Sequence, residues 1–70
     1  MIKEFIHNGF KISIEEMRDI LFYEVEKING RGYMAGNDSC KFSCFIRKMK
    51  KRIDKYMLVP EEERNFERDF

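Results

Sequence analysis

Two cysteines and one histidine are the residues of this sequence best suited to metal or redox chemistry. Cys40 and Cys44 are separated by three residues, and His7 lies far from them along the chain. Structural zinc sites use four ligands, commonly with two residues between paired cysteines, so these side chains predict no metal site. A thiol beside cations at a helix start would have a lowered pKa suited to redox sensing. Packing as small apolar side chains is the simpler expectation for both cysteines.

No other set of side chains forms a catalytic pattern. The glycines at 30, 32 and 36 precede a predicted helix, as in phosphate-binding loops. The element before them is also predicted to be a helix, however, and no Gly-Lys-Ser or Gly-Lys-Thr follows. The carboxylates fall on polar faces or at termini, and no nucleophile is paired with a base. The sequence therefore predicts a protein that is not an enzyme and that uses no cofactor and no metal.

The most distinctive chemical feature is a basic run. Residues 45–57, FIRKMKKRIDKYM, carry six basic side chains and one acidic one. On a helix, most of these cations fall within about 140° of one another, opposite the apolar positions. We call this set the basic ridge, and its members are Lys41, Arg47, Lys48, Lys51, Arg52 and Lys55. Such a ridge suits an acidic protein surface or a nucleic acid, and it is also typical of a solvated helix back.

The charge balance favours a protein partner over a nucleic acid. The chain has 14 basic and 13 acidic residues, so its formal net charge is only +1. The ridge offers no Asn or Gln side chain to base edges, which argues against sequence-specific recognition of DNA. We therefore predict a protein partner with an acidic surface, with a nucleic acid as the alternative. Arg31 and Tyr33, from the neighbouring loop, complete the candidate partner-binding residues.

Length and composition predict one small domain over residues 1–70. With 70 residues, 43% hydrophobic and 39% charged, the chain supports a small core under a charged surface. No run approaches the roughly 18 apolar residues that span a bilayer. The start of the sequence also lacks the pattern of a secretory signal. We expect a cytoplasmic protein with reduced thiols and no contact with a membrane.

The clearest local signal is a hairpin over residues 2–13. Asn8 and Gly9 separate IKEFIH from FKIS, and this dipeptide favours the positive φ angles of a type I′ turn. A two-residue loop pairs His7 with Phe10 and Phe5 with Ile12. These four residues are predicted to share the inward face.

A helix is predicted next, over residues 14–29. Ser13 and Glu16 have the spacing of a capping box, and Gly30 suits the end of a helix. The apolar residues recur at spacings of three and four, as on one face of a helix: Ile14, Met17, Leu21, Val25 and Ile28. Residues 30–39 are then predicted to be a loop, because glycines and small polar residues dominate them.

A second helix is predicted over residues 40–57, with Asp38 or Ser39 as its cap. Its apolar face comprises Phe42, Phe45, Ile46, Met49, Ile53, Tyr56 and Met57. Pro60 ends this helix and opens an acidic tail over residues 58–70. The tail contains the run 61–63 of three glutamates, and Phe66 and Phe70 four residues apart. It is too short to hold as an isolated helix.

The predicted fold is α+β. An N-terminal two-stranded antiparallel hairpin packs on two amphipathic helices, followed by a short acidic C-terminal helix or tail. The expected function is stoichiometric binding to a macromolecule. By analogy of size and composition alone, we expect an inhibitor of the phage or mobile-element type, acting on a host or defence protein. Two alternatives stay open: a nucleic-acid-binding regulatory protein that uses helix 41–55, and a self-associating structural or assembly subunit, for example a homodimer through the hairpin edge.

Overall fold

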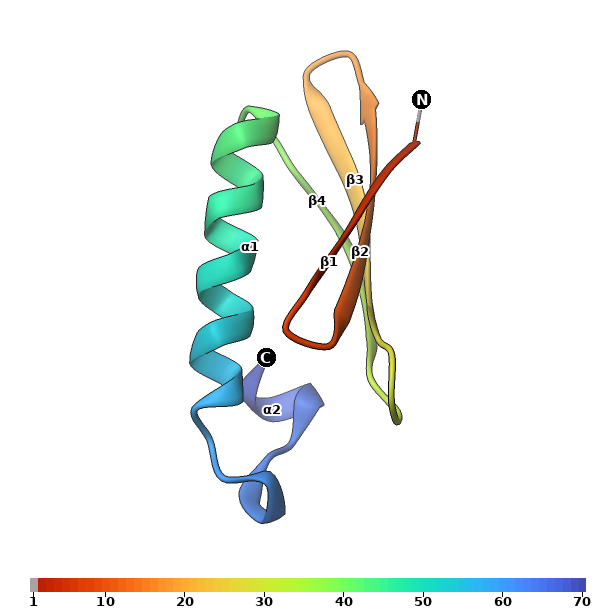
Figure 1. The fold of residues 1–70 in the computed structure, drawn as a ribbon. Coiled ribbons are helices and arrows are strands. Elements are labelled where there is room, and N and C mark those ends of the chain that lie inside the picture. The colour runs from red at the N-terminus through yellow and green to blue at the C-terminus, as the bar shows by residue number, and fades with distance from the viewer. Residues whose placement is uncertain (1) are drawn as a thin grey trace.

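The computed structural model describes residues 2–70 as a four-stranded sheet with one long helix lying across one of its faces (Figure 1). The elements are β1 (Ile2–His7), β2 (Phe10–Met17), β3 (Ile20–Lys27), β4 (Tyr33–Asp38), α1 (Phe42–Met57), the 3₁₀ turn η1 (Glu61–Glu63) and α2 (Phe66–Asp69). The predicted α+β class is confirmed. The prediction of a two-stranded sheet is wrong, because four strands pair in the order β1-β2-β3-β4.

The first turn forms as its sequence predicts. Asn8 and Gly9 have φ angles of 49° and 84°, the left-handed region that a type I′ turn requires. His7 pairs with Phe10, and Phe5 pairs with Ile12, so the predicted register is confirmed. This hairpin is the first half of an antiparallel sheet in which every strand pairs with its neighbour in sequence.

The predicted helix over residues 14–29 is wrong, because this segment forms a second hairpin. Residues 14–17 finish β2, the chain reverses at Arg18 and Asp19, and β3 returns beside β2. Arg18 takes the positive φ of 56° that the tight turn needs. Asp19 is a common turn residue, but Arg18, which takes the positive φ, is not, so the sequence contains only a weak turn signal at this point.

The predicted caps of that helix have other positions in the fold. Ser13 lies within β2, where it pairs with Glu24 of β3. Glu16 pairs with Leu21 near the tip of the second hairpin. Gly30 lies in the loop between β3 and β4 with a φ of 122°, which suits glycine without ending any helix.

The predicted loop over residues 30–39 is also only partly correct. Residues 33–38 form β4, which pairs Met34 with Val25 and Gly36 with Tyr23. The Tyr23 ring occupies the space beside Gly36: a Cβ added there would lie 2.8 Å from the phenol oxygen. Glycine at 36 therefore marks close packing within a strand, not a break in one.

The helix predicted over residues 40–57 is confirmed as α1. It begins at Phe42, two residues later than predicted, and ends at Met57. Neither Asp38 nor Ser39 is its N-cap, since Lys41 takes that position. Asp38 Oδ1 instead accepts a hydrogen bond from the backbone N–H of Cys40 at 3.1 Å, and so it organises the turn into the helix.

The core lies between α1 and the inner face of the sheet. Its buried residues are Phe10, Ile12, Ile14, Leu21 and Val25 from the strands and Phe45, Met49, Ile53 and Tyr56 from α1. The other predicted apolar residues of α1, namely Phe42, Ile46 and Met57, are half-buried at its margin. Burial of each large apolar side chain contributes about 1.5–3 kcal/mol, so this single layer is the main source of stability.

The C-terminal segment differs from the predicted acidic helix or tail. It forms two short helical turns, η1 and α2, and aromatic contacts hold it in place. Phe66 and Phe70 stack at 4.6 Å, and their rings lie 5.9 and 5.5 Å from the buried ring of Phe10. These aromatics pack against the core, and α2 lies near the C-terminal end of α1 (Figure 1).

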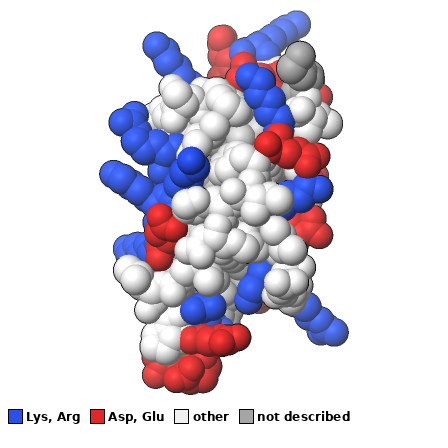
Figure 2. All heavy atoms as spheres, viewed as in Figure 1, with Lys and Arg blue, Asp and Glu red and all other residues white. Residues whose placement is uncertain are grey.

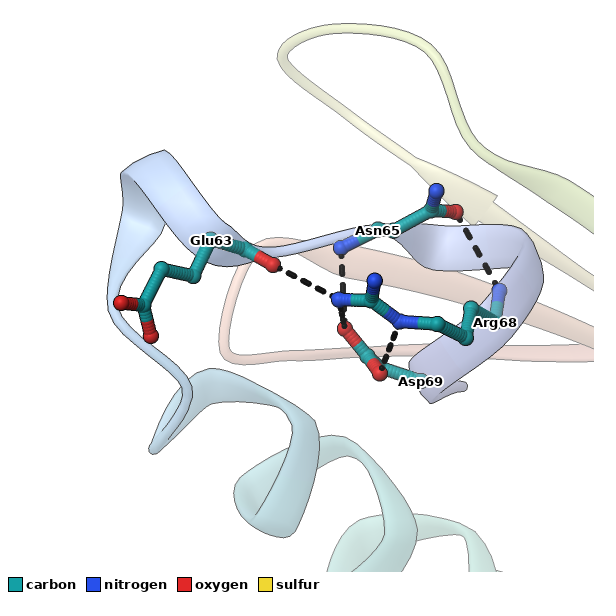
Figure 3. Close-up of polar contacts among 4 residues, drawn as sticks. All are labelled: Glu63, Asn65, Arg68 and Asp69. Atoms are coloured by element: carbon teal, nitrogen blue, oxygen red, sulfur yellow. Dashed lines mark hydrogen bonds and ion pairs between the residues drawn. The ribbon is translucent and has the colours of Figure 1, made fainter.

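Polar contacts fix the turn that presents those aromatics (Figure 3). Arg68 holds Asp69 with two hydrogen bonds, of 2.9 and 3.0 Å, and also donates to the backbone oxygen of Glu63. Asn65 caps α2 by accepting from the backbone N–H of Arg68, while its own N–H donates to Asp69. The hydrogen bond from Arg68, followed by that from Asn65, lowers the pKa of Asp69 below its usual range.

Candidate functional site

The basic ridge forms on α1 as predicted from its spacing. Its members, Lys41, Arg47, Lys48, Lys51, Arg52 and Lys55, are all exposed. Figure 2 shows basic side chains projecting from the side of the molecule formed by α1. Within residues 2–70, Lys48 is the one ridge residue with a carboxylate side chain in ion-pair range, since its Nζ lies 3.8 Å from Asp38. Most positive charges of the ridge therefore have no carboxylate side chain beside them in residues 2–70.

Two residues of the ridge reach other parts of the chain. Lys48 reaches Asp38, the last residue of β4. Arg52 stacks on the Phe70 ring at 4.8 Å and donates to its backbone oxygen at 2.7 Å. The acid of this helix, Asp54, bonds His7 beside the first turn at 2.7 Å. Lys48 thus places one flank of the ridge beside β4, whereas Asp54 lies toward the turn between β1 and β2.

The neighbouring edge strand is open to pairing. β4 is the last strand in the sheet order, so in the described part of the chain its outer backbone groups have no strand partner. Its first five residues, YMAGN, carry no charged side chain, whereas β1 on the opposite edge carries Lys3 and Glu4. Charges on an edge strand discourage pairing with other chains, and β4 has fewer of them than β1. We call β4 together with the basic ridge the basic edge.

The other two predicted site residues do not join the ridge. Arg31 is exposed in the loop between β3 and β4. Tyr33 is 60% exposed, and alternation along β4 directs its side chain to the sheet face away from α1. Partial desolvation, and then the nearby carboxylates of Glu24 and Glu26, raise the pKa of Tyr33 above its ordinary value. Tyr33 therefore belongs to a different surface from the ridge.

The Cys40 thiol does not have the lowered pKa that redox sensing requires. Cys40 and Cys44 are both half-buried free cysteines. Desolvation, and next the hydrogen bond with Asp38, raise the pKa of the Cys40 thiol, which is the opposite of the lowering that redox sensing requires. Among the residues that the structure describes, no group of three or more His, Cys, Asp and Glu side chains is placed to hold a metal ion.

Sequence reasoning missed a second surface, which is the face of the sheet that α1 does not cover. Apolar residues such as Ile20 and Phe22 lie exposed there, beside Glu15 and Glu24. Assignment of residues 14–29 to a helix concealed this face. The signal that reveals it is the alternation in ILFYEVEK, where Leu21, Tyr23 and Val25 point inward and the residues between them point outward.

Neither helix within residues 2–70 combines the length and the apolar character needed to cross a membrane. Comparisons of the chain with protein-family models, with curated proteins and with solved structures gave no match. The candidate sites therefore depend on their own geometry and charge.

Proposed function

We propose that this chain is a non-enzymatic binding protein that acts stoichiometrically, and that its basic edge docks against an acidic protein surface. The observation that carries the proposal is the row of exposed cations along α1, whose flank at Lys48 lies beside β4; Lys48 is the only ridge residue in ion-pair range of a carboxylate side chain in residues 2–70. Complementary potentials of this kind speed association and select the partner.

The cations alone do not account for tight binding. Exposed ion pairs contribute only about 0–1 kcal/mol each, because water and salt screen them. Backbone hydrogen bonds to the open side of β4 add about 0.5–1.5 kcal/mol each and fix the register of the partner. We therefore expect the partner to supply an extended acidic segment. Its backbone would form hydrogen bonds with β4, and its carboxylates would lie near the cations of the ridge.

The biological class that we propose is an inhibitor of the type carried by phages and mobile elements, acting in the cytoplasm on a host or defence protein. Occupation of an acidic surface requires no catalytic group, and a 70-residue chain is large enough to cover one. The support for this class is size, charge distribution and the absence of a catalytic pattern from the sequence.

A nucleic-acid-binding regulatory protein is the second candidate, and the ridge is the observation that favours it. Each Lys or Arg that contacts a phosphate releases counterions, so affinity for DNA or RNA falls steeply with salt. The carboxylates on the uncovered sheet face, which include Glu15 and Glu24, confine any such contact to the α1 side.

The test is affinity capture from a cell lysate, with nuclease treatment, using three forms of the chain. They are the unchanged protein, a Lys48→Glu/Lys51→Glu/Lys55→Glu variant, and a control with Lys27→Glu and Arg18→Glu, which alters cations off the ridge. We expect a protein band that survives nuclease, is kept by the control, and falls about tenfold or more in the ridge variant, since each lost attraction contributes about 0.2–1 kcal/mol and repulsion is added.

Two outcomes contradict the proposal. Equal capture by the ridge variant and the unchanged protein removes the ridge from binding. Loss of all captured material on nuclease treatment replaces the protein partner with a nucleic acid.

A further inference from the structure

The face of the sheet away from α1 is left uncovered by every other element in residues 2–70 (Figure 1). Side chains alternate along each strand, so each strand residue can be assigned either to the core face or to the uncovered face. The uncovered face, which we call the open face, comprises Ile2, Glu4, Ile6, Lys11, Ser13, Glu15, Met17, Ile20, Phe22, Glu24, Glu26, Tyr33, Ala35 and Asn37.

The open face is far more apolar than a solvated sheet face normally is. Eight large apolar residues of the described chain are strongly exposed, and all but Leu58 lie on this face or directly continue it: Ile2, Ile6, Met17, Ile20, Phe22, Ile28 and Tyr33. Their exposed fractions range from 43% for Phe22 to 68% for Ile6. Antiparallel sheets with one face in water usually carry polar residues there. Clustered exposed apolar side chains mark an interaction surface.

A depression lies within this face. Its volume is about 270 Å³, and Ile2, Phe22, Ser13 and Ala35 are among its lining residues. The strand register explains it: Ile2, Glu15 and Phe22 occupy one row across the sheet, and in the next row the small Ser13 and Ala35 leave space on either side of Glu24. A depression that Ile2 and Phe22 border, with small residues at Ser13 and Ala35, suits one or two bulky apolar side chains of a partner.

Charge selects the kind of partner. The face carries four carboxylates, from Glu4, Glu15, Glu24 and Glu26, against the single cation Lys11 among its described residues. Lys11 already pairs with Glu4 at 3.3 Å. Glu15 and Glu24 both line the depression. This arrangement repels nucleic acids and acidic proteins, and it attracts a basic one.

A second copy of the chain does not satisfy these requirements. Two open faces packed together would bring the carboxylates of one copy near those of the other. A second copy's α1 has its apolar face buried in its own core, so only its polar side is free to approach. The partner must supply apolar and basic side chains on the same element.

We propose that the open face binds a basic amphipathic helix of a partner protein. The apolar stripe of that helix covers Ile2 and Phe22 and fills the depression, and its Lys and Arg residues flank Glu15 and Glu24. A helix suits a sheet face, because an uncovered face is normally buried by a helix or another sheet, and α1 already packs in this way on the opposite side. The open face and the basic ridge carry opposite charge and lie on different elements; the open face shares with the basic edge only the β4 residues Tyr33, Ala35 and Asn37.

The test uses two synthetic 18-residue peptides with the same leucine stripe, one with lysines and one with glutamates on its polar face. Each is titrated into protein labelled at its isoleucine methyl groups and followed by NMR. We expect the lysine peptide alone to bind. It should shift the methyl signals of Ile2, Ile6 and Ile20 and leave those of the buried Ile12 and Ile53 in place.

A matched pair of variants gives a second readout. Glu15→Gln/Glu24→Gln should weaken binding of the lysine peptide about threefold to tenfold, as expected for loss of two exposed attractions. The control Glu61→Gln/Glu62→Gln removes the same charge from the exposed η1 turn and should bind normally. Both changes are nearly isosteric, and the methyl spectrum reports directly whether each variant is folded.

Three results overturn the inference: equal binding of both peptides, shifts confined to methyl groups off the open face, or concentration-dependent shifts of Ile2 and Ile20 in the protein alone. The last result would show that a second copy covers the face. None of these results affects the capture experiment that tests the basic edge. Failure of the helix-binding proposal can therefore be distinguished from failure of the proposed function.

Discussion

At the scale of single residues, Gly36 most clearly links sequence to packing. It lies in the centre of β4, opposite Tyr23, and an added Cβ would lie 2.8 Å from the phenol oxygen and 3.0 Å from the ring carbon that bears it. The aromatic ring is part of the sheet's inner face beside Phe45, at a centroid distance of 4.8 Å, so it cannot move without disturbing the core.

We therefore predict that Gly36→Ala destabilises the fold by about 1–3 kcal/mol, the usual cost of overpacking. The neighbouring exposed residue provides a control: Asn37→Ala should change the free energy of unfolding by less than about 0.5 kcal/mol. Urea unfolding of both variants measures the difference. A Gly36→Ala variant as stable as the control would contradict the close packing of Tyr23 on β4.

Asp38 links the end of β4 to the start of α1 through its charge. The hydrogen bond from the backbone of Cys40 is the main cause that holds the pKa of Asp38 below its usual value, and Lys48 adds to it. A carboxyl whose pKa is lower in the folded state stabilises the fold above its unfolded pKa, about 3.9. That contribution is lost as the pH falls through the lower, folded pKa.

We expect that Asp38→Asn makes the free energy of unfolding less dependent on pH under acidic conditions. Between about pH 5 and pH 2, the free energy of unfolding should fall less steeply in this variant than in the unchanged protein. Asp19→Asn, in the exposed turn between β2 and β3, removes the same charge and serves as the control. Parallel curves for Asp38→Asn and the unchanged protein would refute the role of Asp38.

At the scale of elements, the C-terminal turns owe their order to aromatic contacts. The helix α2 has four residues, far fewer than the roughly 12 that an isolated helix needs in water. Phe66 stacks on Phe10 and meets Tyr56 edge-on at 5.8 Å, so α2 is held by the core.

Phe66→Ala should accordingly destabilise the protein by about 2 kcal/mol, less than for a fully buried ring because Phe66 is half-buried. Glu67→Ala, on the exposed side of the same turn, should have almost no effect. Amide hydrogen exchange should show α2 and η1 losing protection in Phe66→Ala while α1 keeps its own. Retained protection in α2 would mean that the polar contacts of Arg68 and Asp69 hold this helix in place without the Phe66 ring.

The elements also show how far the sequence predicts this fold. The first hairpin and α1 were predictable, because Asn8-Gly9 and the apolar spacing of residues 42–57 are local signals. The second hairpin was not, because Ile14, Leu21 and Val25 fit a helical period as well as an alternating one. The turn at Arg18 and Asp19 has only Asp19 as a common turn residue, and the glycine at position 36 led to the prediction of a loop where a strand forms. Only tertiary packing resolves these ambiguities.

The same limits apply to the candidate site. The ridge was predictable, because it depends on the phase of a single helix. Its position beside β4 was not, because residues 33–38 were expected to be a loop. The open face was hidden for a related reason: it exists only once residues 14–29 are strands, with Ile20 and Phe22 directed outward.

At the scale of the whole molecule, the net charge of +1 conceals two surfaces of opposite sign. Cations line the exposed side of α1 (Figure 2), whereas carboxylates and apolar side chains occupy the open face. Pairing of β4 with β4 of a second copy would place the two basic ridges beside each other, so the arrangement favours a different partner. A molecule built in this way is suited to meet one acidic and one basic protein surface.

Docking at the basic edge is tested most directly by titrating ¹⁵N-labelled protein with an extended peptide of alternating threonine and glutamate. Since the N–H of Lys27 donates to the oxygen of Gly32, alternation leaves the backbone of Tyr33, Ala35 and Asn37 facing outward. These amides and those of the ridge should shift, and the three β4 amides should become protected from exchange. A threonine–lysine peptide should leave them unchanged. Shifts at Ile2, Glu4 and Ile6 of β1 instead, or equal response to both peptides, would contradict the account.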